Sequence, residues 1–226
     1  HTAMGEYQYV VENGYHGNWV DMVCNYTYNG TGPTWLITER DGRHFMESMR
    51  IEKNRPHRMF PTLETGKHQW KDYEVSVSVR RLSQKGMAGL VFSMNHSIDT
   101  LVFYLDGKDK ATVAYRHKEE VHVLKEVAFP HGCDQEYRLK VDCDGRIAKV
   151  YVDDQELFRV EDDLVARGGK VGITADCPSR FADFKVCVSE KTKQEIDVAE
   201  LAVKETETEE MKKHPKMKLW KKIDLK

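Results

Sequence analysis

Short runs of alternating apolar and polar residues fill the chain from Trp70 to Val188, and each run ends at Gly, Asp, Asn or Pro. In residues 73–80 every odd position is apolar and every even position is polar. This period of two is typical of a β-strand with one buried face and one solvent-facing face. Short strands separated by frequent turns predict an all-β antiparallel sandwich or barrel rather than a parallel α/β sheet.

The same pattern continues downstream of this first strand. The strands that it predicts are 88–94, 100–105, 111–117, 121–127, 137–141, 147–152, 156–160, 170–174 and 181–188. The sequences Asp106-Gly107, Asp144-Gly145 and Asp153-Asp154 predict tight turns between neighbouring strands. Only residues 161–166 have the character of a helical turn.

Residues 1–69 are less regular than the rest of the sandwich region. Their strand-like segments are 19–24, 34–38 and 44–51. We expect these segments to add strands to the same two sheets, so that the predicted sandwich domain covers residues 1–189.

The pattern changes after Val188. Residues 195–210 hold seven acidic residues and one lysine, whereas residues 211–226 hold seven lysines and one aspartate. Such an abrupt change of charge is uncommon inside a packed domain. We therefore predict a charged C-terminal linker or tail over 190–226, partly helical over 195–210, in which 218–226 regain strand character as the start of a further domain.

Composition limits the classes of function. Hydrophobic residues make up 40% of the chain, enough for a core, but none of its segments reaches the roughly 18 consecutive apolar residues of a membrane helix. A formal net charge of −2 lacks the basic footprint of a nucleic-acid binder. We therefore expect neither a membrane nor a nucleic acid as partner.

Cysteine usage and the N-terminus say little about the compartment. Five cysteines, with no Cys-x-x-Cys pair, suggest reduced and mostly buried thiols. The N-terminus lacks the basic and apolar regions of a signal peptide, which leaves a bacterial secreted and a cytoplasmic location both open. Sequons at Asn25, Asn29 and Asn95 would matter only in a glycosylating pathway.

Several segments of the strand region are similar to the concanavalin A-like lectin/glucanase superfamily, which includes jelly-roll carbohydrate-binding and LamG-like modules. The similar segments are Trp70-Lys-Asp-Tyr-Glu-Val75, Met87-Ala-Gly-Leu-Val-Phe92, residues 146–158, Gly168-Gly-Lys-Val-Gly-Ile-Thr174 and Phe181-Ala-Asp-Phe-Lys-Val186. This resemblance implies a two-sheet antiparallel jelly roll and a polysaccharide or oligosaccharide as ligand.

A second resemblance lies at the end of the chain. In the superfamily named above, such modules are commonly fused to glycoside hydrolases and polysaccharide lyases. The ending Trp220-Lys-Lys-Ile-Asp-Leu-Lys226 is similar to the first strand of β-propeller domains in rhamnogalacturonan-lyase-like enzymes. It implies the N-terminal module of such a lyase, with a covalently linked catalytic domain.

Sugars bind to flat aromatic faces and to planar hydrogen-bonding side chains. Tyr104, Asp106 and Arg116, with Tyr115 and His117 beside them, supply both kinds on consecutive strands. If the odd-numbered residues of the first of these strands face the core, Tyr104 and Asp106 face outward. The alternative is that Tyr104 simply covers the outer surface of a sheet.

A charged segment before the regular strands supplies a second candidate site. Trp35 and Arg40 are further candidates for carbohydrate binding. Glu39 and Asp41 lie two positions apart, as two carboxylates on one strand face would for acid–base catalysis, and His44 lies across the turn. These three residues are the catalytic candidates, and a solvated hairpin with local ion pairs is the alternative.

One residue is a candidate metal ligand. A structural calcium ion is frequent in the concanavalin A-like superfamily, and the resemblance places Asp183 at a motif position that often supplies an oxygen ligand. An ordinary surface aspartate is the alternative. The histidines show no His-x-His or His-Glu-x-x-His spacing, so transition-metal catalysis is unsupported.

Three functional hypotheses follow from these observations. The first is a non-catalytic carbohydrate-binding module that serves a carbohydrate-active enzyme. The second is a polysaccharide lyase or glycoside hydrolase with an active site of its own. The third is a structural assembly domain that positions a neighbouring domain through the charged tail.

Overall fold

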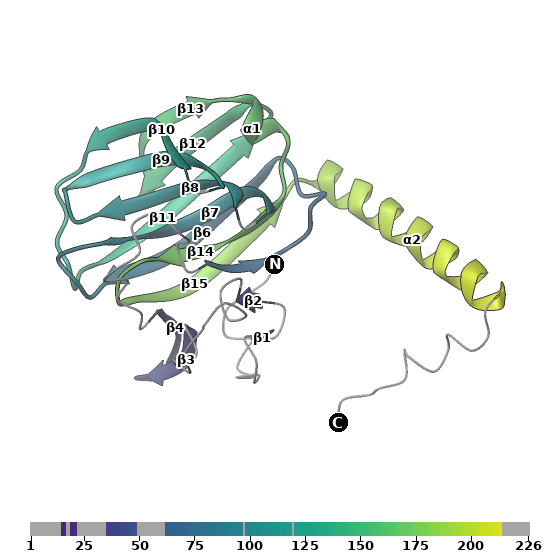
Figure 1. Ribbon diagram of the computed structural model, residues 1–226, viewed down its shortest axis with the longest axis horizontal. Coiled ribbons are helices and arrows are strands. Elements are labelled where there is room, and N and C mark those ends of the chain that lie inside the picture. The colour runs from purple at the N-terminus through teal and green to yellow at the C-terminus, as the bar shows by residue number, and fades with distance from the viewer. Residues whose placement is uncertain are drawn as a thin grey trace. The chain divides into compact units, whose positions relative to one another are not determined.

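The computed structural model describes residues 15–16, 19–21, 35–48, 62–96, 98–118 and 120–213. Those up to residue 188 form an all-β, two-sheet antiparallel sandwich of the jelly-roll type, as predicted (Figure 1). The chain divides into two units, residues 1–188, which contain the sandwich, and residues 189–226.

The first sheet has eight strands within the described residues. In spatial order they are β1 (Tyr15–His16), β2 (Trp19–Asp21), β5 (Thr62–Thr65), β14 (Lys170–Ala175), β7 (Met87–His96), β8 (Asp99–Asp106), β9 (Lys110–His117) and β10 (Glu120–Ala128). All neighbouring pairs are antiparallel.

The second sheet has seven strands among the residues that the structure describes. In spatial order they are β13 (Gln155–Glu161), β12 (Ile147–Val152), β11 (Glu136–Asp144), β6 (Tyr73–Arg81), β15 (Ser179–Val188), β4 (Arg43–Ser48) and β3 (Trp35–Arg40). These pairs are antiparallel as well.

The hydrophobic core lies between the two sheets and is built from alternate strand positions. In β6, Tyr73 and the three valines that follow at every second position are buried, as the alternation predicted. In β8, Leu101, Phe103 and Leu105 are buried in the same core, and Phe103 meets Phe158 of the second sheet edge to face, with ring centroids 6.5 Å apart. This packing leaves the even-numbered residues of β8 on the outer face of the first sheet.

Most predicted elements coincide with observed ones, and the differences have local causes. The helical turn expected at 161–166 is α1 (Asp163–Ala166). The turn after β8 begins at Gly107, because Asp106 still pairs within the sheet. Strand β5 was not predicted, because its four residues include a single apolar side chain, Leu63, although all four are buried.

The second unit contains one helix, α2 (Glu190–Lys213), in its described part. It begins earlier and ends later than the predicted 195–210. Glu190 in the first turn and Lys212 and Lys213 in the last turn have the signs that the helix dipole favours. None of the helices in the described part of the chain is long and apolar enough to cross a membrane.

Candidate functional site

One end of the first sheet gathers polar side chains from three separate chain segments. The β7–β8 and β9–β10 hairpins both turn at this end, and Asp99 is paired with His96 on one side and with His117 on the other. The register therefore brings polar residues of three neighbouring strands into the last row of the sheet.

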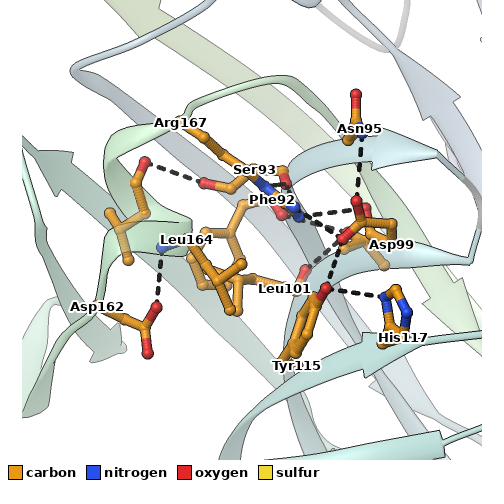
Figure 2. Close-up of polar contacts among 12 residues, drawn as sticks. Phe92, Ser93, Asn95, Asp99, Leu101, Tyr115, His117, Asp162, Leu164 and Arg167 are labelled. Atoms are coloured by element: carbon orange, nitrogen blue, oxygen red, sulfur yellow. Dashed lines mark hydrogen bonds and ion pairs between the residues drawn. The ribbon is translucent and has the colours of Figure 1, made fainter.

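The third segment follows α1 and supplies Arg167. The Asp162 carboxylate caps α1 by accepting the backbone N–H of Leu164 at 2.8 Å. After Arg167 the chain turns through Gly168 and Gly169, whose φ angles of 66° and 131° lie in the region that favours glycine. The turn directs the Arg167 side chain to the end of the sheet, where it reaches Asp99 (Figure 2).

Asp99 is the centre of the resulting group, which we call the Asp99 cluster: Asn95, Asp99, Tyr115, His117 and Arg167. The Asp99 carboxylate accepts hydrogen bonds from Arg167 Nη1 (2.7 Å), the Tyr115 hydroxyl (2.9 Å) and Asn95 Nδ2 (3.2 Å). His117 Nδ1 lies 3.0 Å from the same Tyr115 hydroxyl oxygen. Figure 2 shows Asn95, Tyr115 and Arg167 converging on Asp99, with His117 in contact with Tyr115.

Arg167 is anchored to the backbone as well as to Asp99. Its Nη2 and Nε atoms donate to the carbonyl oxygen of Ser93, at 2.8 and 3.2 Å, and Nη2 also donates to the carbonyl oxygen of Asp99 at 3.2 Å. Ser93 lies where the β7–β8 register shifts, and its φ of 47° turns its carbonyl out of the regular ladder. The bulge thus supplies the acceptor that holds the guanidinium in place.

The network favours one protonation state for Asp99 and one for Tyr115. Burial alone would raise the pKa of Asp99, but hydrogen bonds from Arg167, Asn95 and Tyr115 outweigh it and lower that pKa. Burial and the hydrogen bond to Asp99 raise the pKa of Tyr115. At neutral pH the cluster therefore presents a carboxylate and a protonated phenol, which suits hydrogen bonding to a ligand rather than proton transfer.

Aromatic rings adjoin the polar part of the cluster. The Tyr115 ring lies near-parallel to His122, with centroids 6.3 Å apart and an angle of 28°, and 5.7 Å from His117 at 34°. The Arg167 guanidinium lies 5.8 Å from the Tyr115 ring centroid. Flat rings beside planar hydrogen-bonding groups form the kind of surface that binds the apolar and polar sides of a polyol ring.

The three residues predicted on β8 and β9 lie on the outer face of the same sheet, away from the cluster. Tyr104 is half-buried, and its burial raises its pKa. Asp106 accepts the backbone N–H of Lys108 at 2.8 Å and so orders the hairpin turn. Arg116 is buried, which lowers its pKa to about 10. Tyr104 and Asp106 remain partly accessible, whereas Arg116 does not face solvent.

Trp35 is buried, whereas the Arg40 side chain is half exposed and forms an ion pair. Trp35 is only 1% exposed and packs on Phe181, so its ring offers no face to a ligand, contrary to the prediction. The apolar ring is buried because β3 is an edge strand of the second sheet and Trp35 packs into the core. Arg40 Nε and Arg180 Nε both donate to Glu47, at 3.0 and 2.8 Å, in an ion-pair group across the neighbouring strands β3, β4 and β15.

The predicted catalytic trio is separated by a turn. Asp41 and Gly42 have φ angles of 52° and 74°, which makes them the central residues of a two-residue hairpin turn rather than strand residues. Glu39 and Asp41 therefore do not share a strand face as expected. Glu39 instead pairs across the hairpin with His44, at 3.6 Å between Oε2 and Nε2, and its side chain is mostly exposed.

The predicted calcium ligand has a different partner. Asp183 lies at an irregularity of β15, and its carboxylate forms an ion pair with Arg43, which also donates to Glu136 at 3.0 Å. The Arg43 guanidinium thus occupies the position expected for a calcium ion, and Asp183 does not fit a calcium site. Among the described residues, no group of three or more His, Cys, Asp or Glu side chains is arranged to hold a metal ion.

Sequence reasoning missed the centre of the cluster. Tyr115 and His117 lie beside the predicted site, and Asn95 begins a sequon. The sequence pattern does not single out Asp99 or Arg167. Asp99 and Arg167 are 68 residues apart, so no local spacing connects them. The available signal was the Gly-Gly pair after α1, which marks a sharp turn behind Arg167.

Neither a protein-family model nor a curated protein matches this chain. Solved structures do share its fold. The carbohydrate-binding module CBM66 from Bacillus subtilis is 18% identical with a TM-score of 0.59, over 76% of this chain and 96% of that chain. A protein of unknown function with a galectin-like fold, from Bacillus subtilis, is 13% identical with a TM-score of 0.52, over 68% and 86%.

A mutant of the GH43 protein BlXynB from Bacillus licheniformis is 16% identical with a TM-score of 0.50, over 76% of this chain but only 39% of that chain. The sandwich fold thus corresponds to one part of that longer protein. At these identities the similarities show the fold, a lectin-like jelly roll.

Proposed function

We propose that this chain is a non-catalytic carbohydrate-binding module whose binding site is the Asp99 cluster. The observation that carries the proposal is the set of planar hydrogen-bonding side chains, Asn95, Asp99 and Arg167, held in one geometry beside the Tyr115 ring. A site ordered before binding loses little side-chain entropy when the ligand arrives. The lectin-like fold, shared with a solved carbohydrate-binding module, supports the same function.

Isothermal titration of the full chain against a panel of polysaccharides tests the proposal. We expect saturable binding to at least one of them, and Asn95→Ala should weaken it about fivefold, since a neutral hydrogen bond contributes about 1 kcal/mol. Gln155→Ala removes an exposed amide in β13 and is the matched control. The absence of binding to every polysaccharide would contradict the proposed function.

The outer face of β8 is the competing location for the same function. Tyr104 and Asp106 keep partly exposed side chains there. If Tyr104→Ala abolishes binding while Asn95→Ala has no effect, the site lies on that face and not at the Asp99 cluster.

We further propose an accessory role, in which the sandwich serves a linked catalytic domain of a carbohydrate-active enzyme. Two observations support it: the sandwich matches only part of the longer GH43 protein, and α2 is a charged segment outside the sandwich unit. A rhamnogalacturonan-lyase-like context is the narrower form of this proposal, but residues 220–226, on which it rests, lie outside the described residues.

Limited proteolysis tests the division between module and linker. Trypsin should cut first within residues 189–226, which contain many lysines, and the remaining sandwich should bind the saccharide with unchanged affinity. First cleavage within the sandwich, or loss of binding after removal of the tail, would contradict the division.

A further inference from the structure

The Asp99 cluster is electrically balanced. It holds one guanidinium and one carboxylate in direct contact, at 2.7 Å, and their side chains are 26% and 18% exposed. The β9–β10 turn next to it contains Lys118, and the carboxylate Glu120 begins β10. Neither the contact pair nor the turn therefore offers a surplus positive charge to a ligand.

The hydrogen bonds within the cluster leave some donor and acceptor positions of the same side chains for a ligand. The Asp99 carboxylate accepts two hydrogen bonds at Oδ1 and one at Oδ2, of about four that a carboxylate accepts. Arg167 makes four hydrogen bonds with the roughly five N–H groups of a guanidinium, and the remaining N–H is on Nη1. Asn95 adds an exposed amide with its own donor and acceptor.

A hydroxyl both donates and accepts, so neighbouring hydroxyls of a sugar ring match this arrangement. A carboxylate only accepts, and it would meet a guanidinium that Asp99 already neutralises. It would also bring a second negative charge close to Asp99 without a further cation to offset the repulsion. The arrangement therefore favours an uncharged polyol over an anion.

We infer that the Asp99 cluster selects neutral saccharides with adjacent hydroxyl groups and discriminates against uronic acids. The inference rests on the proposed function and specifies its ligand class. In this inference the negative charge of Asp99 determines specificity. Arg167 donates hydrogen bonds to the ligand, and its positive charge is balanced by Asp99.

The main comparison is between polygalacturonate and its methyl ester, which has the same sugar backbone without the negative charge. Binding of the full chain is measured by titration to neutral polysaccharides, to polygalacturonate and to its methyl ester, at 50 mM and 300 mM NaCl. We expect any binding to the ester to be at least about tenfold tighter than to polygalacturonate, and affinity for neutral polymers to change less than about twofold with salt. Equal or tighter binding of polygalacturonate, weakened by salt, would overturn the inference while leaving saccharide binding intact.

A variant with altered charge provides a second readout. Asp99→Asn keeps the shape of the side chain but leaves the Arg167 charge unbalanced, so the ratio of uronate to neutral affinity should rise about tenfold or more. Asp142→Asn is the matched control, because Asp142 pairs with Lys149 at 3.3 Å on the second sheet. An unchanged ratio in a folded Asp99→Asn variant would contradict the inference. If that variant does not fold, the salt dependence of the unaltered chain decides.

Discussion

Replacement of Arg167 by methionine should destabilise the sandwich by about 2–3 kcal/mol. The side chain makes four hydrogen bonds, to the Ser93 carbonyl and to Asp99, and about three quarters of it is buried. Removing one partner of a buried ion pair costs about 3–5 kcal/mol, and partial exposure of both side chains reduces this value. Methionine keeps most of the apolar contact, so the change reports on the polar network.

Urea denaturation at pH 7 measures this loss, and thermal unfolding should show a fall in the midpoint of about 5–10 °C for a domain of this size. Arg159→Met is the control. Arg159 also pairs with a carboxylate, Glu156, at 2.6 Å, but its side chain is 58% exposed, and we expect no measurable shift of the midpoint.

The pH dependence of the Arg167→Met effect follows from Asp99. Because the native pKa of Asp99 is lowered, its ionised form stabilises the fold fully above the unfolded-state pKa of about 3.9. This stabilisation is lost as the pH falls through the lower native pKa. The difference between the unaltered chain and Arg167→Met should therefore be largest at pH 7 and shrink as the pH falls below the unfolded-state pKa of Asp99. A difference that stays constant, or one that equals the control at pH 7, would refute the reasoning.

Three further predictions concern the core and the thiols. Gly89→Ala would place a Cβ 2.0 Å from the Phe103 carbonyl oxygen, so urea denaturation should show a loss of about 3 kcal/mol. By the same assay Phe103→Ala should cost about 3–5 kcal/mol, and Val123→Ala, at a 55% exposed position, less than about 0.5 kcal/mol. Burial raises the pKa of the Cys143 and Cys177 thiols, so iodoacetamide at pH 8 should modify them only after denaturation, as followed by mass spectrometry.

Each of these three has a contradicting outcome. Native-like stability of Gly89→Ala would mean that β7 and β8 lie farther apart than described. Equal costs for the Phe103 and Val123 variants would contradict the placement of the core between the sheets. Rapid alkylation of the native chain at Cys143 would show that this thiol is accessible.

The alternation of side chains was enough to predict the sandwich, because it is a local property of each strand. The valines of β6 and the residues Leu101, Phe103 and Leu105 of β8 are buried as expected. The charge pattern after Val188 likewise indicated a segment outside the sandwich, and its described part is the helix α2.

Where the register is irregular, the local pattern no longer determines which face a residue occupies. The shift in β7 near Ser93 creates the acceptor for Arg167, and the shift in β15 accompanies the pairing of Asp183 with Arg43 instead of with a metal ion. A bulge adds a residue to one strand and moves the side chains beyond it to the other face. The alternation of apolar and polar residues along a strand does not show where such a bulge occurs.

The sequence by itself therefore determined the class of fold, the core positions and the charged C-terminal segment, because these depend on neighbours a few residues apart. Only the tertiary structure decided that Trp35 is buried, that Asp41 lies in a turn, and that Asp99 meets Arg167. Those outcomes depend on strand order and on the hairpin ends that the fold brings together. The candidate site consists of such long-range contacts, and for that reason it became visible only in three dimensions.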